Sequence, residues 1–290
     1  MNQVHSLDHR DGVVQSTIQD AAQIPALSHV EAASMASAEL KRFITLVKGL
    51  SVEDWSKPTA CPLWNVRQMV AHVTGAAAGY AHWAELKRQY SPWAQRPYRR
   101  AGLSLLDAIN QIQVDDRAHV SPADLITELH TVGPRAIATR RRLPAILRAL
   151  RLPMPLLGIA RIDYLTDLIY TRDMWMHRLD ICRATGSEMV QSADHDGRIV
   201  ALVLRDLARK LMRKRSDTSI VYALSGPAGG AWRIGRNTIP SATICMPALD
   251  FNLLAAGRRT ATEVRAQNDT AVNGDPTVVT WALDNTSVPY

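Results

Sequence analysis

Apolar residues recur at the 3.6-residue period of an α-helix from His29 onwards, and this helical period gives way to short strand-like runs after residue 216. Helical segments are predicted to begin near residues 29, 65, 104, 121 and 162, with proline-containing loops between them. Amphipathic helices in succession bury their apolar stripes by packing against one another. We therefore predict a mainly α protein whose larger part is a four-helix bundle.

Local signals mark where several of these helices begin and end. Asn65 followed by Gln68 has the spacing of a capping box, and this helix is expected to run past Tyr80. Ser121-Pro122 combines a favourable cap with a proline in the first turn. The long helix over residues 162–184 is expected to close at Gly186. Prolines at positions 92 and 97 are expected to break the chain.

The C-terminal part of the chain alternates between short strands and helices. Strands are predicted over residues 219–224, 231–234, 243–246 and 262–266, with a helix over 249–256 and a last helix that starts at Asp275-Pro276. The predicted organisation has four parts: a flexible leader (1–28), the helical bundle (29–190), a connecting helix or linker (191–216) and a small α+β domain (217–290).

Composition limits the classes of function. The 290 residues carry a net charge of +7, and their basic residues fall on amphipathic helices without interleaved aromatic residues, so nucleic-acid binding is not favoured. No apolar run is long enough to span a bilayer, and the N-terminus has no apolar signal sequence. Three widely spaced cysteines suggest a reducing compartment, so we expect a cytoplasmic protein. The sequence does not decide between a monomer and a homodimer.

Histidine and aspartate side chains on two of the predicted helices have the spacing of metal ligands. Asp173 and His177 are four residues apart, so they project from neighbouring turns at the edge of the apolar stripe of the 162–184 helix. Asp180 lies one turn further along, and His72 flanks the stripe of an earlier helix. If the helices are neighbours, His72, Asp173 and His177 can share a metal. Spacing alone equally allows a surface Asp–His pair and a hydrogen-bonded His72.

Two sequence motifs carry a family resemblance over about residues 29–190. The first is Trp55-x-x-Pro58-Thr59-x-Cys61-Pro62-x-Trp64-x-Val66-Arg67-x-x-Val70-x-His72-Val73-x-Gly75, and the second is Asp173-x-Trp175-x-His177-Arg178-x-Asp180-Ile181-x-Arg183-Ala184-x-Gly186. In this order they resemble the signatures of the mycothiol-dependent maleylpyruvate isomerase family, within the DinB-like helical metalloenzymes. Short glycine-containing motifs after residue 225 are similar to the sterol-carrier-like domain that follows the bundle in that family.

The resemblance implies a function and a set of ligands. It implies that His72, Asp173 and His177 hold a divalent metal, with zinc expected, and that mycothiol or a similar small thiol is the cosubstrate. Arg178 and Asp180 are candidates for orienting groups in catalysis. The characterised isomerase has glutamate at the acid position, so Asp173 is one methylene shorter. Transfer of sulfur to a small electrophile is therefore preferred over isomerisation of maleylpyruvate to fumarylpyruvate. The alternative is a non-catalytic protein that binds a metal and a small molecule.

Overall fold

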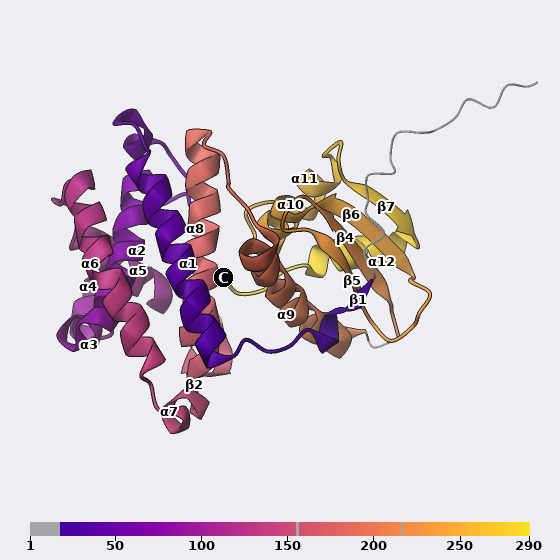
Figure 1. Ribbon diagram of the computed structural model, residues 1–290, viewed down its shortest axis with the longest axis horizontal. Coiled ribbons are helices and arrows are strands. Elements are labelled where there is room, and N and C mark those ends of the chain that lie inside the picture. The colour runs from indigo at the N-terminus through magenta and orange to yellow at the C-terminus, as the bar shows by residue number, and fades with distance from the viewer. Residues whose placement is uncertain (1–17, 155–156, 216) are drawn as a thin grey trace, which may run out of the picture. The chain divides into compact units, whose positions relative to one another are not determined.

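The protein divides into two compact units, which are described separately because their mutual placement is not determined (Figure 1). The computed structural model describes residues 18–154, 157–215 and 217–290. The helical unit comprises Leu27–Val190 together with Pro289–Tyr290. The mixed unit comprises the described residues up to Ala26 and Gln191–Val288. None of the described helices has the length and apolar character needed to cross a bilayer.

The helical unit is built around α1, α2, α6 and α8, which pack side by side (Figure 1). Its described elements are α1 (His29–Lys48), a 3-10 turn (Glu53–Ser56), α2 (Val66–Ala81), α3 (Trp83–Gln89), α4 (Pro92–Arg100), α5 (Leu105–Asp115), α6 (Pro122–Arg141), α7 (Ala145–Ala149), β2 (Arg151–Met154), β3 (Gly158–Arg161), a π-helical segment (Tyr164–Ile169) and α8 (Tyr170–Thr185). Strands β2 and β3 form an antiparallel hairpin. The mainly helical fold class is confirmed.

Capping residues set the helix ends in the way the sequence predicts. Asn65 and Gln68 form a reciprocal capping box at the start of α2. Ser121 caps α6 with Pro122 in its first turn. Helix α8 ends at Gly186, whose φ of 76° lies in the left-handed region that glycine adopts without steric cost.

The region after α2 differs from the prediction of a proline break. Pro92 instead begins α4, because Ser91 accepts a hydrogen bond from the Trp93 amide and the first helical turn needs no donor from proline. Pro97 lies inside the same short helix. The predicted long helix over 162–184 is also modified, since its first part is the π-helical segment before α8.

The mixed unit contains a five-stranded sheet in the order β1-β5-β4-β6-β7. Strand β4 pairs antiparallel with β5 and parallel with β6, while β1 is parallel to β5 and β7 is antiparallel to β6. The elements are β1 (Gln19–Asp20), a 3-10 turn (Ala21–Gln23), a π-helical segment (Ala193–Gly197), α9 (Arg198–Lys214), β4 (Ile220–Ser225), β5 (Gly230–Ile234), β6 (Ala242–Pro247), α10 (Ala248–Ala255), α11 (Ala261–Arg265), β7 (Ala271–Gly274) and α12 (Pro276–Asn285).

Several details of the mixed unit depart from the sequence prediction. Residues 262–266 were expected as a strand, but Thr260 and Glu263 form a capping box that starts α11. The outer strand of the sheet, β7, follows later in the chain than the strand that was predicted over residues 262–266. Within the predicted leader, Gln19 and Asp20 form β1 against β5, and residues 1–17 of that leader lie outside the described residues. Helix α9, predicted as a connecting segment, belongs to this unit.

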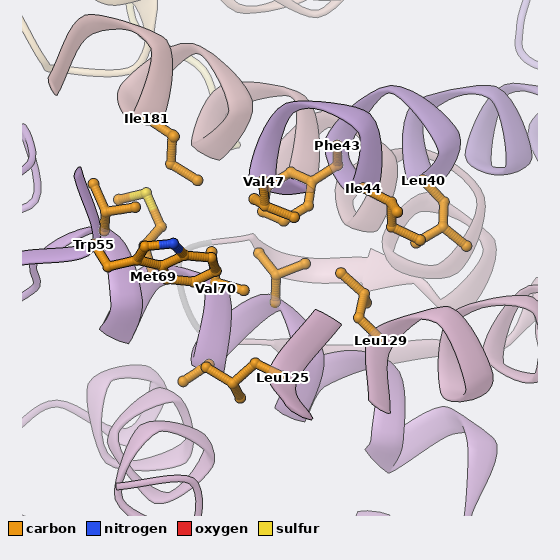
Figure 2. Close-up of a cluster of buried hydrophobic side chains, with 13 residues drawn as sticks. Leu40, Phe43, Ile44, Val47, Trp55, Met69, Val70, Leu125, Leu129 and Ile181 are labelled. Carbon is orange, nitrogen blue, oxygen red and sulfur yellow. The ribbon is translucent and has the colours of Figure 1, made fainter. Parts of the chain in front are cut away.

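A cluster of buried apolar side chains packs the helices of the bundle against one another (Figure 2). Phe43 from α1, Met69 from α2 and Ile181 from α8 are fully buried in one cluster, with Leu125 and Leu129 from α6. Each such side chain contributes on the order of 1.5–3 kcal/mol when it leaves water. Because Met69 and Ile181 belong to this cluster, it fixes how α2 faces α8 and therefore where their polar flanks meet.

Candidate metal centre

Three polar side chains converge where α2 faces α8. His72 Nε2 lies 3.6 Å from Asp173 Oδ2, and His177 Nε2 lies 3.3 Å from Asp173 Oδ1. One ligand atom from each of the three residues falls within 4.8 Å of the others. The structure therefore brings together the three residues that the sequence predicts as ligands, although His72 is about a hundred positions from the other two.

These distances match what one metal ion requires. Zinc binds histidine nitrogen and carboxylate oxygen at about 2.0–2.1 Å, so neighbouring ligand atoms of a tetrahedron lie roughly 3.3 Å apart. Both histidine side chains are almost completely buried, with 6% and 5% exposure, while Asp173 is 31% exposed. The cluster thus offers three atoms that can bind a metal, and its side at Asp173 is accessible to solvent.

A chain of glutamines fixes the tautomer of His72. Gln89 Nε2 donates to the carbonyl of Gly75 at 2.9 Å, and that carbonyl can only accept. Gln89 Oε1 is then the acceptor for Gln113 Nε2, at 2.9 Å, which leaves Gln113 Oε1 to face His72 Nδ1 at 2.8 Å. His72 Nδ1 must therefore carry the proton, and its Nε2 lone pair is directed toward Asp173.

Gly75 makes this arrangement possible. A Cβ at this position would lie 2.5 Å from Gln113 Cβ, so only glycine lets α5 approach α2 closely enough for Gln113 to reach His72. The sequence prediction did not include Gln113, Gln89 or Gln95, whose Nε2 donates to the backbone carbonyl of Gln89. No motif marks them, because their roles depend on the packing of three separate helices.

The carboxylate of Asp180 faces the second histidine. Asp180 is fully buried, and its Oδ2 lies 3.4 Å from His177 Nδ1, as expected for a carboxylate that orients a ligand. Burial opposes the charged form of His177, but the Asp173 and Asp180 carboxylates outweigh it and raise the pKa of His177 to about 9. Burial likewise acts against ionised Asp173, yet His177 and His72 lower the pKa of Asp173 well below its ordinary value.

Trp64 closes one side of the cluster. Its ring stacks on His72 with centroids 4.8 Å apart, and its centroid is 6.3 Å from that of His177. The Trp64 indole N–H donates to Gln111 Oε1 at 3.2 Å. Trp64, which belongs to the first of the two family-like motifs, thus covers the two imidazoles.

Arg178, the other predicted orienting residue, is occupied elsewhere. Its Nε and Nη2 donate to the two carboxylate oxygens of Glu39 at 2.7 and 3.2 Å, and Nη1 donates to the carbonyl of Val190 at 2.9 Å. This buried ion pair joins α8 to α1. The geometry assigns to Arg178 a contact between helices, while its neighbour His177 faces the cluster.

Two small pockets adjoin the accessible side of Asp173. The larger has about 100 Å³ of free space and is lined by His72, Asp173, Gln113, Tyr90 and several apolar side chains. The smaller, of about 30 Å³, shares Asp173 and Tyr170 with the larger and also reaches Arg140. A small molecule in either pocket lies directly beside the cluster.

The helical bundle and the buried His–Asp–His cluster beside a pocket place this protein in the class of helical-bundle proteins with a candidate metal site. The family model described as mycothiol maleylpyruvate isomerase N-terminal domain matches residues 36–182, and the chain belongs to this family. The match ends before most of the mixed unit, so the predicted likeness of that unit to sterol carrier proteins stays a prediction.

Solved structures show the same fold at low identity. The crystal structure of the mycothiol-dependent maleylpyruvate isomerase is 13% identical, with a TM-score of 0.55, and the match covers 88% of this chain and 96% of that chain. A histidine-to-alanine mutant of the isomerase is 12% identical, with a TM-score of 0.53 and coverage of 83% and 93%. No curated protein sequence matches the chain. The likeness to these structures concerns the fold.

Proposed function

We propose that this protein is a metal-dependent enzyme that uses mycothiol or a similar small thiol to attack an electrophile. His72, Asp173 and His177 hold one divalent ion, with zinc preferred. The observation that carries the proposal is the spacing of the ligand atoms, 3.3 and 3.6 Å, with an accessible side at Asp173. Two histidines and one carboxylate with an open position are typical of catalytic zinc sites, whereas structural sites usually have four protein ligands.

The surrounding residues prepare the site for this chemistry. A bound divalent ion would stabilise a thiolate near neutral pH and so supply a soft nucleophile. Gln113 accepts a hydrogen bond from His72 Nδ1, and the Asp180 carboxylate faces His177 Nδ1 at 3.4 Å, so both imidazoles present Nε2 toward Asp173. Trp64 covers the imidazoles and limits access of water from its side. Arg178 is assigned a structural role, and Asp180 the role of positioning His177.

Thiol transfer and isomerisation share their first step. The sulfur–carbon bond forms at one carbon of an activated double bond, and the proton of the thiol ends on the neighbouring carbon. If the adduct is released, the reaction is S-transfer. If it rotates and eliminates the thiol, the reaction is cis–trans isomerisation. We prefer S-transfer because Asp173 is shorter than the glutamate of the characterised isomerase and because one scaffold supports several chemistries.

Metal analysis of the purified protein tests the site. We expect about one metal ion per chain in the wild type and almost none in His72→Ala and His177→Ala. His130→Ala is the matched control, because His130 is an exposed histidine of α6, and it should keep its metal. Stoichiometric metal in both ligand variants would refute the site.

Kinetics then tests the thiol. The metal-loaded wild type is assayed with mycothiol and a panel of small electrophiles, with His72→Ala as the comparison. We expect turnover that requires both the metal and the thiol. A protein that holds its metal but shows no thiol-dependent turnover would contradict the enzyme proposal and favour the non-catalytic binding protein. The cytoplasmic location expected from the three cysteines also remains part of this proposal.

A further inference from the structure

One face of the β2–β3 hairpin carries two apolar and two cationic side chains. The strand register pairs Arg151 with Arg161. Two residues further along, it pairs Pro153 with Ile159. Side chains alternate between the two faces of a strand pair, so these four lie on the same face. All four residues are exposed, and the exposed fraction of Ile159 reaches 73%.

Helix α7 extends this exposed apolar surface at one end of the bundle (Figure 1). Ile146 is 75% exposed, and Leu147 and Leu150 are exposed as well. The amide of Ile162 donates to the carbonyl of Leu150 at 3.0 Å, so the hairpin starts where α7 ends. Single exposed apolar side chains are ordinary, but a group of them marks an interaction surface. We call Ile146, Leu147, Leu150 and the exposed hairpin face the α7–hairpin surface.

The charge of the segment that builds this surface has a single sign. Residues 141–162 contain five arginines and no aspartate or glutamate. Arg141, Arg142 and Arg151 are exposed and form no ion pair with any of the described residues. Arg151 and Arg161 lie directly opposite each other, where like charges destabilise a strand pair. An anionic partner would offset this repulsion and complement the charge of the surface.

The spacing along the hairpin suits the interface of a lipid bilayer. Two residues of a strand span about 7 Å, so Pro153 and Ile159 lie about that far beyond the arginine pair. Apolar faces that lie in a membrane interface are buried by about 5–10 Å, while cations stay at the level of the lipid phosphates. With Pro153 and Ile159 inserted to this depth, Arg151 reaches the headgroups. Arg161 contributes less, because Asp163 Oδ1 accepts a hydrogen bond from its Nε at 2.9 Å.

We propose that the α7–hairpin surface docks the protein peripherally on an anionic phospholipid bilayer. Ile146 and Ile159 enter the boundary between the headgroups and the acyl chains. Arg141, Arg142 and Arg151 contact the lipid phosphates. The apolar side chains of this surface are aliphatic, whereas single-stranded nucleic acids are bound by stacking on aromatic ones. This docking goes beyond the proposed function and rests on neither the metal nor the thiol.

Sedimentation with lipid vesicles tests the proposal. The full-length protein is mixed with vesicles of phosphatidylcholine alone or of phosphatidylcholine and phosphatidylglycerol in equal amounts. We expect the wild type to bind the mixed vesicles and to remain in solution with the neutral ones. Ile146→Ser and Ile159→Ser should each weaken binding about tenfold, and Arg151→Gln about fivefold. All three side chains are exposed, so their replacement leaves the fold intact.

An exposed arginine and an exposed isoleucine of the mixed unit provide matched controls, Arg236→Gln and Ile239→Ser. Both control variants should bind the mixed vesicles as the wild type does. Attraction through the net charge of +7 alone would weaken binding equally in Arg236→Gln and Arg151→Gln and would not respond to Ile159→Ser. That pattern overturns the proposal, and so does a wild type that does not bind the mixed vesicles.

Insertion and self-association distinguish a bilayer from a second copy of the chain. In mixed vesicles that contain brominated lipid, the fluorescence of Ile159→Trp should be quenched beyond that of the wild type, and Ile239→Trp should match the wild type. Equal quenching in all three proteins overturns the proposal. If the surface joins two copies instead, analytical ultracentrifugation shows a dimer that Ile159→Ser converts into a monomer, and neither protein binds vesicles. That result also refutes docking on a membrane.

Discussion

Gln113 offers the most direct test of how the cluster is organised. The Gln113→Leu variant keeps a side chain of similar size but removes the acceptor of His72 Nδ1, which lies 2.8 Å from Gln113 Oε1. His72 then loses the hydrogen bond that fixes its tautomer, and a fraction of the imidazole carries its proton on Nε2, where the metal must bind. Loss of such a partner typically lowers metal affinity 10–100-fold, or about 1.4–2.8 kcal/mol.

The same change also affects stability, so a matched variant is needed. Gln113→Leu leaves His72 Nδ1 and Gln89 Oε1 without partners, which costs on the order of 1–3 kcal/mol for each buried group that stays unpaired. Gln95→Leu breaks the glutamine chain at a site further from His72, where Gln95 Nε2 donates to the carbonyl of Gln89 at 3.0 Å. It should destabilise the protein while it leaves the tautomer of His72 unchanged.

Zinc affinity is measured by competition with a chromophoric chelator at pH 7.5, after circular dichroism has shown that each variant is folded. We expect Gln113→Leu to bind zinc 10–100-fold more weakly than the wild type and Gln95→Leu to remain within about threefold. If both folded variants bind zinc equally, the glutamine chain does not control His72. If Gln113→Leu binds zinc as tightly as the wild type, the inferred tautomer is wrong.

Two further predictions concern packing and thiol reactivity. Gly75→Ala should lower the thermal unfolding midpoint of the helical unit by several degrees. The new Cβ would lie 2.5 Å from Gln113 Cβ, and overpacking of this kind typically costs about 1–3 kcal/mol. The midpoint is measured by circular dichroism, and an unchanged value would contradict the close contact. Burial raises the pKa of Cys182 to about 11, so at pH 7.5 its thiolate is roughly 300-fold rarer than that of an ordinary cysteine. Iodoacetamide should therefore spare Cys182 in native protein, and rapid labelling seen by mass spectrometry would disprove its burial.

The positions of the main helices follow from local sequence signals. Asn65 and Gln68 define the start of α2, and Gly186 ends α8, because capping depends on residues three or four positions apart. The same local signal was present at Thr260 and Glu263, where the prediction of a strand was wrong. There, the apolar pattern was too short to separate a strand from one turn of helix.

The ligand cluster was only partly accessible from the sequence. Asp173 and His177 share one helix, so their proximity follows from a spacing of four residues. His72 joins them only because the buried cluster that includes Met69 and Ile181 fixes how α2 faces α8. The number of residues between positions on two different helices does not reveal how those helices pack. His72 was therefore indicated by the family-like motifs.

The sequence by itself determined the helical bundle and the mixed C-terminal unit, and it pointed to the three residues that are predicted as ligands. Only the tertiary structure decided what surrounds them: Gln113 behind His72, Trp64 over the imidazoles, and the ion pair that occupies Arg178. It alone placed Arg140 between two tyrosines beside the pocket. The physical reason is that capping and periodicity act within one helix, whereas hydrogen bonds between side chains of different helices depend on how those helices pack.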